Sequence, residues 1–155
     1  MNKKIMPILL ILVLAISSIG ATFGADNVKL EGMDADKSIG NVGVMNLTNT
    51  TSGGRVNGLC VEKGQYIYIG DTVPVTPGTN GITNNNQVKQ LVYENYRDDM
   101  TPQEGYDLQH AIWFFTDGIP AENVAQLDMI DRVRNNPKVI PDTNAVNTIS
   151  EAKKL

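Results

Sequence analysis

Few residues in this chain could carry chemistry, and the scarcest of them are a thiol and an imidazole. Cys60 is the only cysteine and His110 the only histidine among 155 residues. A single thiol can be a buried apolar side chain, half of an intermolecular disulfide, a nucleophile, or a partner in some other covalent bond. One histidine and one cysteine cannot complete a zinc site, and the acidic segments lack calcium-loop spacing. We therefore expect no metal and no cofactor.

The element with the clearest sequence signals is a helix, which we expect over residues 102–117. It begins at a capping box formed by Thr101 and Glu104, with a proline at the first helical position, where its missing N–H costs nothing. It ends at Gly118, which is followed two residues later by another proline. Apolar residues at positions 108, 112 and 115 recur at helical spacing and predict its buried stripe.

Gln109 lies at the margin of that stripe, one turn before Trp113 and one turn after Gly105. A neutral amide in such a setting needs a hydrogen-bond partner or a functional reason. A glycine inside a helix indicates the close approach of another chain segment, so Gly105 is expected to clear space one turn before Gln109.

The segments before this helix predict a β-rich part. Residues 26–54 are rich in Asn, Thr, Ser and Gly and are expected to form an irregular lead-in or an edge strand. Residues 55–62 and 66–69 are expected to be two strands joined by a glycine turn, with Cys60 within or at the end of the first. A loop is expected over residues 71–81.

Two further helices are expected, over residues 87–96 and 121–134. Each carries apolar residues at helical spacing: Val88, Leu91, Val92 and Tyr96 in the first, and Val124, Leu127, Ile130 and Val133 or Arg134 in the second. A last strand could begin at residues 139–140. The expected fold is α+β, with a sandwich- or barrel-like β-rich part that carries Cys60 packed against a small α-helical part that carries Gln109.

The first 25 residues have the anatomy of a secretion signal, with Lys3 and Lys4, an apolar run over 5–19 and small residues after it. That run is too short for a permanent membrane span. Without it, 11 of the 13 basic residues remain against 17 acidic ones, a formal charge of −6. Phosphate binding needs clustered basic residues, so nucleic acid is excluded as a partner.

The chain thus divides into a signal peptide (1–25), a lead-in or edge strand (26–54), one domain (55–140) and a polar tail (141–155). We expect a secreted or cell-surface protein that is monomeric. Asn46 and Asn49 each begin an N-glycosylation triplet and are candidate modification sites.

Two short motifs resemble those of the thioester domains, a family of Cys–Gln thioester-forming adhesins on Gram-positive bacteria and some archaea. The letters LCV at 59–61 are similar to the family's strand of an aromatic or Leu, Cys and an aliphatic residue. The letters LQHAIW at 108–113 are similar to its Thr-Gln-x-Ala-Ile-Trp helix, with Leu108 where threonine is frequent. Between them, the helix ending in YENY at 93–96 takes the place of a family helix that ends near Gly-Tyr. The resemblance covers about residues 55–118.

The resemblance implies that the Cys60 thiolate attacks the side-chain amide carbon of Gln109 and expels ammonia, leaving an internal thioester. A surface amine, such as a lysine on a host or neighbouring cell, would then displace the sulfur and become amide-linked. Each domain would act once, so the protein would be a covalent binder and not an enzyme. A bond across 49 residues would also stabilise the fold by about 4 kcal/mol.

Water must be kept from such a bond, and aromatic side chains near it are the candidate shields. Trp113 lies one turn after Gln109 on the same side of the helix, and Tyr66 or Tyr68 follows Cys60 in the expected hairpin. His110 is expected to be partly exposed and to face away from Gln109, because adjacent helix residues diverge by about 100°. Its functional role would be that of proton acceptor for the incoming amine.

Two alternatives remain. One is a secreted papain-like cysteine hydrolase with Cys60 as nucleophile, His110 as base, and Asp117 or Asn123 as orienter. That fold places its cysteine at a helix N-terminus, where the thiol pKa is lowered, whereas Cys60 is expected in a strand. The other is a surface-layer or adhesion module that binds without covalent chemistry.

Overall fold

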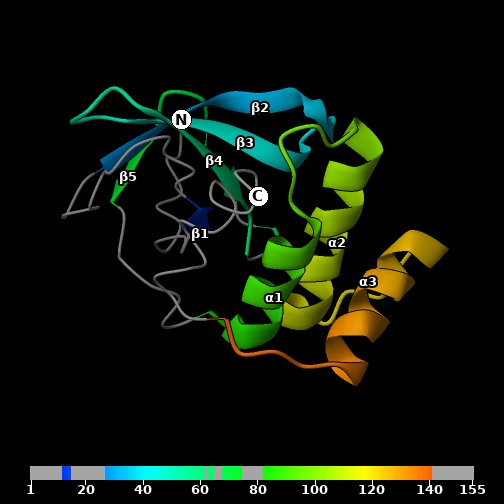
Figure 1. Cartoon of the computed structure of the whole chain (residues 1–155). Helices are drawn as coiled ribbons and strands as arrows, with labels where there is room; N and C mark the ends of the chain where they lie inside the picture. Colours follow the sequence, from blue (N-terminus) through cyan, green and yellow to red (C-terminus); the bar gives the residue numbers. More distant parts are fainter. Residues whose placement is uncertain (1–11, 15–26, 62, 65–67, 75–81, 141–155) are drawn as a thin grey trace.

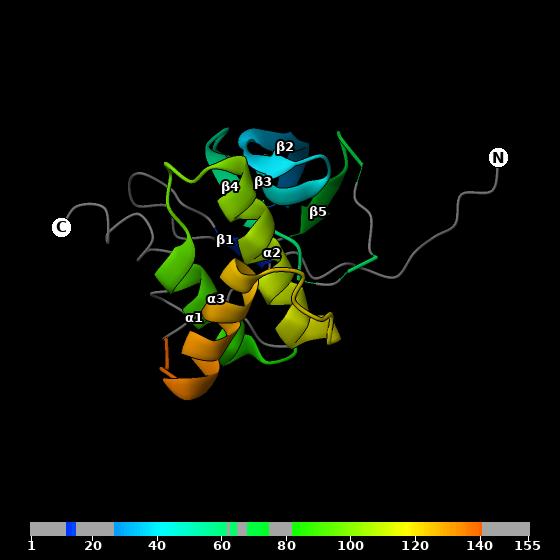
Figure 2. The same cartoon turned by 90° about the vertical axis from the view of Figure 1, so that its right-hand side faces the viewer.

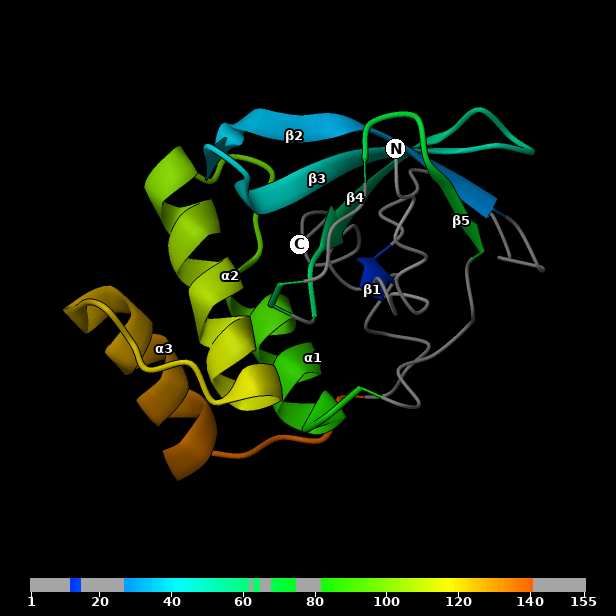
Figure 3. The same ribbon diagram turned by 180° about the vertical axis from the view of Figure 1, so that it is seen from behind.

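The computed structural model describes residues 12–14, 27–61, 63–64, 68–74 and 82–140. Within these residues a β-sheet lies beside a group of three helices (Figure 1). The view from behind shows the same separation (Figure 3). The fold is therefore α+β, as expected from the sequence.

The strands of the described residues form one antiparallel sheet. Its spatial order is β1 (Leu12–Leu14), β4 (Arg55–Leu59), β3 (Val42–Asn49), β2 (Asn27–Ile39) and β5 (Thr72–Pro74). The two outermost strands have three residues each, so β2, β3 and β4 make up most of the sheet. A second layer that would make a sandwich or barrel is not seen in the described part of the chain.

The segment expected to be a lead-in or an edge strand instead forms β2 and β3, which hold inner positions in the sheet. The expectation was wrong because β2 does not alternate regularly. Its pairing with β3 shifts between Leu30 and Gly32 and again between Met33 and Ser38. Each shift changes which side chains face the core and so hides the period of two.

β4 ends at Leu59, so Cys60 directly follows the strand, as expected. The second neighbour of β4 is β1, which lies inside the expected secretion signal and places Leu12 opposite Leu59 and Leu14 opposite Asn57. β4 is therefore an inner strand only while residues 12–14 lie against it.

The expected second strand of a hairpin, 66–69, is not found where it can be checked. Tyr66 lies outside the described residues. Tyr68 and Ile69 lie at a turn and are 72% and 74% exposed. The expected loop 71–81 begins with β5, which pairs with residues 27–29 of β2.

The helices are α1 (Asn85–Asn95), α2 (Pro102–Asp117) and α3 (Val124–Asn135). α2 is the central one: it packs against β2 and β3 and against both other helices (Figure 2). The expected stripe of α1 is confirmed, because all its members are buried: Val88, Leu91, Val92 and Tyr96. None of the helices in the described residues is long and apolar enough to cross a membrane.

α3 is rotated relative to the expected stripe. Ile130 and Val133 are buried, but Val124 and Leu127 are 71% and 48% exposed. Gln126 is completely buried instead, because its amide donates to the buried carboxylate of Asp107 on α2. After α3, residues 139–140 form no strand, although Ile140 joins the core.

The start of α2 is fixed by the capping box, in which Thr101 and Glu104 each bond to the other's backbone N–H. Its end is fixed by Gly118, whose φ of 70° suits glycine. Gly105 is needed for packing, because a Cβ there would overlap the backbone carbonyl oxygen of Lys37 in β2. The close approach expected at Gly105 is confirmed, and it seats β2 on α2 one turn before Gln109.

Candidate functional site

The structure brings Cys60 and Gln109 together although 49 residues separate them in the chain. The Gln109 side-chain carbonyl accepts a hydrogen bond from the Cys60 backbone N–H at 2.8 Å. The Gln109 amide nitrogen donates to the Cys60 backbone carbonyl at 2.5 Å. We call this pair of bonds the Gln109 clamp. It supplies the partner that a 1% exposed amide requires.

The clamp also fixes the distance between the groups that could react. The Gln109 amide carbon lies no more than about 4 Å from the Cys60 backbone nitrogen, because a C=O bond of about 1.2 Å separates it from the accepting oxygen. The Cys60 sulfur is three bonds from that same nitrogen. Rotation about the Cα–Cβ bond therefore moves the sulfur within the immediate surroundings of this carbon.

Local sequence explains why Cys60 is available at this position. Leu59 and Val61 on either side are 1% and 6% exposed, and both belong to the core cluster. Cys60 itself is of intermediate exposure. Anchored neighbours therefore hold the backbone of a residue that is itself only partly buried.

The turn after Cys60 is tied to the end of α2. The Lys63 backbone N–H donates to the Asp117 carboxylate at 3.2 Å, and the Lys63 ammonium lies 5.7 Å from the centre of the Trp113 ring. Gln109 and Asp117 thus hold two points of the chain that follows β4. Trp113 follows Gln109 by one turn of α2 and is 8% exposed. Its role as a shield stays a prediction.

His110 is buried and not partly exposed, so that expectation was wrong. It is 5% exposed because its ring stacks on Tyr106 at 4.4 Å and meets the edge of Trp113 at 5.2 Å. Burial lowers the His110 pKa, an effect opposed by the nearby Glu122 carboxylate, and the imidazole is therefore neutral at pH 7. Its Nδ1 is 3.7 Å from Glu122, beyond hydrogen-bond distance.

Two polar atoms of this aromatic cluster have no hydrogen-bond partner among the described residues: His110 Nδ1 and Trp113 Nε1. A neutral imidazole has one nitrogen that donates and one that accepts, and an indole N–H can only donate. The cluster therefore contains two buried nitrogens without a hydrogen-bond partner, one of them on the residue that follows Gln109. No signal in the sequence indicated that these two atoms would be unpaired.

The remaining shield candidates receive no support. A side chain as exposed as Tyr68 covers no buried bond, and its backbone N–H bonds to Asp71. Tyr66 lies outside the described residues. Gly105 acts through packing, as described above, and positions α2 against the sheet.

The two glycosylation candidates lie in β3. Asn49 is 2% exposed, and its side-chain oxygen accepts from the backbone N–H groups of Thr51 and Ser52, which closes the turn before β4. A glycan at Asn49 is incompatible with this burial, so that expectation was wrong. Asn46 is half-buried in the middle of the sheet.

In the described part of the chain, neither candidate orienter of the hydrolase arrangement bonds to His110. Of its two candidate orienters, Asn123 donates its amide to Asp107, and the Asp117 carboxylate accepts from Lys63 and Thr116. Cys60 follows a strand, so it lacks the helix N-terminus that lowers a catalytic thiol pKa.

Sequence reasoning missed a buried carboxylate on α2. Asp107 is 3% exposed, and one of its oxygens accepts hydrogen bonds from the amides of Gln103, Asn123 and Gln126. These bonds fasten α3 to α2 two residues before Gln109. Amides and carboxylates are ordinary surface residues in a sequence, so nothing in their spacing indicated this cluster.

A second glutamine makes a clamp of the same kind. Gln90 on α1 is 1% exposed. Its amide nitrogen donates to the Asn136 backbone carbonyl at 2.9 Å, and its carbonyl accepts from the Lys138 backbone N–H at 2.8 Å. This Gln90 clamp holds the chain after α3. Its backbone partners belong to an asparagine and a lysine, so it has no thiol.

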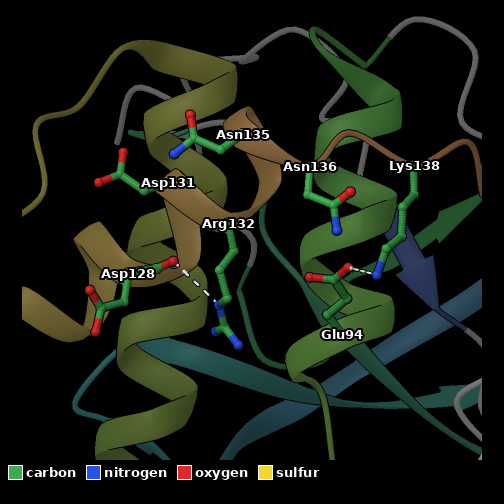
Figure 4. A pocket seen from close by; sticks show the side chains of 7 residues that line it. All are labelled: Glu94, Asp128, Asp131, Arg132, Asn135, Asn136 and Lys138. Carbon is green, nitrogen blue, oxygen red and sulfur yellow. Dashed lines mark hydrogen bonds and ion pairs between the residues drawn. The ribbon is translucent and has the colours of Figure 1, made fainter.

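A shallow hollow of about 890 Å³ lies between the ends of α1 and α3 (Figure 4). Within its lining Lys138 pairs with Glu94 at 2.7 Å, and the Arg132 guanidinium donates to the Asp128 backbone carbonyl. None of its lining residues belongs to the Gln109 clamp. Among the described residues no cluster of His, Cys, Asp and Glu could hold a metal ion.

Comparison of the chain with protein-family models, with curated proteins and with solved structures gives no match.

Proposed function

We propose that this chain is an exported surface protein of the thioester-domain class, in which Cys60 and Gln109 form an internal thioester that captures amines covalently. The single observation that carries the proposal is the Gln109 clamp, which holds a buried amide carbon beside the cysteine predicted to attack it. We further propose that the sheet is one layer of the sandwich- or barrel-like β part expected from the sequence.

The chemistry needs proximity and dryness more than strong acids or bases. Holding nucleophile and carbonyl in one geometry supplies a large effective molarity. The Cys60 sulfur adds to the Gln109 amide carbon and ammonia leaves with the thiol proton. Trp113 and the core residues on either side of Cys60 limit access of water, which would otherwise hydrolyse the product.

The buried imidazole of His110 is suited to the second step. An incoming amine must lose a proton when it replaces the sulfur, and a neutral imidazole can accept one. His110 is neutral at pH 7 because burial lowers its pKa. This role assists the amine transfer and leaves the formation of the thioester to Cys60 and Gln109.

Methylamine trapping tests the proposal, with the Gln90 clamp as an internal control. Secreted protein is incubated with methylamine, digested, and mapped by mass spectrometry. We expect methylamide at Gln109 and none at Gln90. Both amides are buried and each makes hydrogen bonds to the backbone of a remote segment, but only Gln109 is bonded to a cysteine.

The Cys60→Ala variant should incorporate no methylamine at either position. Incorporation at Gln109 in this variant would show that the cysteine is not needed, and absence of incorporation in the parent protein would contradict the proposal.

A further inference from the structure

The edge of β4 beside Cys60 is occupied in this structure by an apolar segment of the chain itself. Residues Leu12–Leu14 pair with it antiparallel, with Leu12 opposite Leu59, Val13 opposite Gly58 and Leu14 opposite Asn57. These residues belong to the expected secretion signal and leave the protein when that signal is removed. No other described segment then pairs with this edge of β4, which ends next to Cys60.

We propose that this edge receives an extended segment of the target protein, whose lysine lies opposite Cys60. The inference rests on the proposed thioester function and specifies how its target is recognised. β1 shows which geometry the edge accepts: an antiparallel strand of apolar residues. Adding a strand to an exposed sheet edge is a general mode of peptide recognition, in which backbone bonds give affinity and alternate side chains give specificity.

The register determines where the target lysine must be. In an added antiparallel strand, one residue lies opposite Leu59, as Leu12 does in β1. The residue that precedes it in the added strand lies opposite Cys60. Directly opposed residues place their side chains on the same face, with Cβ atoms about 5 Å apart. A lysine there extends along the face that carries the Cys60 sulfur, and so reaches the carbon of Gln109 to which that sulfur is bound.

The thioester limits the length of the added ladder. In the unreacted chain both backbone polar groups of Cys60 are bonded to the Gln109 side chain. Thioester formation expels the Gln109 nitrogen, so only the bond from the Cys60 N–H to the Gln109 carbonyl oxygen can persist. The Cys60 N–H is then not available to a docked strand, and the reactive position lies at the end of the paired segment.

The side chains of β4 indicate the rest of the target sequence. Leu59 is 1% exposed and belongs to the core, so the target residue opposite it should be apolar. Gly58 has no side chain and tolerates any residue opposite. A target segment therefore begins with lysine and continues with an apolar residue. Because the exported form carries a formal charge of −6, basic flanks are favoured over acidic ones.

The transfer step is balanced without another reagent. The lysine nitrogen bonds to the Gln109 acyl carbon, the carbon–sulfur bond breaks, and one ammonium proton passes through the His110 side chain or water to the leaving Cys60 sulfur. The products are an amide linkage to the target and a free thiol.

Two six-residue peptides of equal composition test the register. The first, acetyl-Ser-Lys-Leu-Val-Leu-Thr-amide, places lysine opposite Cys60 when its apolar residues lie as β1 does. The second, acetyl-Ser-Leu-Val-Leu-Lys-Thr-amide, places lysine at the other end of β4. Secreted protein is mixed with each, and adduct formation is followed by intact mass. We expect the first to react about tenfold faster, because both peptides make the same backbone bonds but only the first holds its lysine beside the thioester.

Three comparisons decide the outcome. Equal rates for the two peptides, with methylamine still incorporated at Gln109, would overturn the docking proposal and leave the thioester intact. Loss of methylamine incorporation as well would count against the proposed function itself. Methylation of the backbone nitrogens of the first peptide removes the N–H groups that would bond to β4, and should lower its reaction rate to that of the second peptide. An unchanged rate would overturn the proposal.

The full chain provides the matched control. Synthesised without membranes, it keeps residues 12–14, which occupy the β4 edge. We expect it to incorporate methylamine but to react with both peptides at similar slow rates. Retention of the first peptide's advantage in this form would show that the preference arises elsewhere and would contradict docking at β4.

Discussion

Two buried glutamines in this molecule do the same structural work, and only one of them faces a cysteine. Gln90 and Gln109 are each 1% exposed, and each uses both ends of its amide to hold the backbone of a remote segment. Gln90 on α1 bonds to the backbone of residues 136 and 138, which follow α3. Gln109 joins α2 to the end of β4.

The difference shows what the clamp geometry can and cannot explain. Two good hydrogen bonds account fully for the burial of Gln90, so the same bonds would account for the burial of Gln109. What they do not account for is the cysteine on the clamped residue, the indole one turn away, and the unpaired nitrogens of His110 and Trp113. These features accompany the Gln109 clamp and not the Gln90 clamp.

The largest expected effect is on stability. Cys60→Ala removes the covalent link but keeps the backbone groups that Gln109 holds. We expect a loss of about 4 kcal/mol in the free energy of unfolding, from the loop-closure entropy of a cross-link spanning 49 residues. Denaturant unfolding of the secreted protein measures it.

Gln90→Ala is the comparison, since it removes two hydrogen bonds and no covalent link. Its expected loss is about 2 kcal/mol. If Cys60→Ala leaves the free energy of unfolding unchanged while Gln90→Ala lowers it, the cross-link makes no contribution to stability.

An intermediate effect is expected where β2 rests on α2. Gly105→Ala places a methyl group against the Lys37 carbonyl, and the backbone must move to relieve the overlap. We expect a loss of about 2 kcal/mol, with a reduced yield of thioester because α2 carries Gln109. Gly54→Ala is the control, since its methyl group meets only the Ser52 hydroxyl at 3.2 Å. Equal stability of the two variants would mean that the approach of β2 to α2 is not tight.

The smallest expected effect is a dependence on pH near the Gln109 clamp. Burial lowers the pKa of His110, so the unfolded chain binds its proton more readily than the folded one. The stability that arises from this difference in proton binding is fully present above pH 6.5, the ordinary pKa of histidine. It declines as the pH falls below that value. His110→Phe keeps an aromatic ring and should remove this decline between about pH 7.5 and 5.5.

Glu94 near the Gln90 clamp provides the contrast. Burial raises its pKa, but hydrogen bonds from Lys138 and Gln90 outweigh this and lower it below 4.5. Its stabilising effect is therefore present above that value and is lost only in more acidic solution. Glu94→Gln should leave the decline in stability between about pH 7.5 and 5.5 unchanged. If the decline disappears in this variant, it arises from Glu94 and not from His110.

The sequence predicted the parts whose signals are local. The capping box of α2, the glycine at its end and the stripe of α1 are all read within one or two turns, and the structure confirms them. Gly105 was predicted as a point of close approach, but the partner, the Lys37 carbonyl, could not be. A glycine inside a helix predicts that another segment approaches closely, but it does not identify that segment.

The missed parts depend on contacts distant in the chain. β2 and β3 were expected to be irregular because register shifts interrupt the alternation of β2. The stripe on α3 was misplaced because a buried hydrogen bond between Gln126 and Asp107 outweighs the burial of Val124 and Leu127. The Gln90 clamp had no sequence signal at all, since its partners are backbone groups.

The central claim is tested most directly by the intact mass of the freshly secreted protein. Formation of the thioester expels ammonia, so we expect a mass lower by one ammonia than the sequence of the exported chain requires, with no deficit in Cys60→Ala. A full, unmodified mass in the parent protein would contradict the account and leave the Gln109 clamp, like the Gln90 clamp, as a pair of hydrogen bonds.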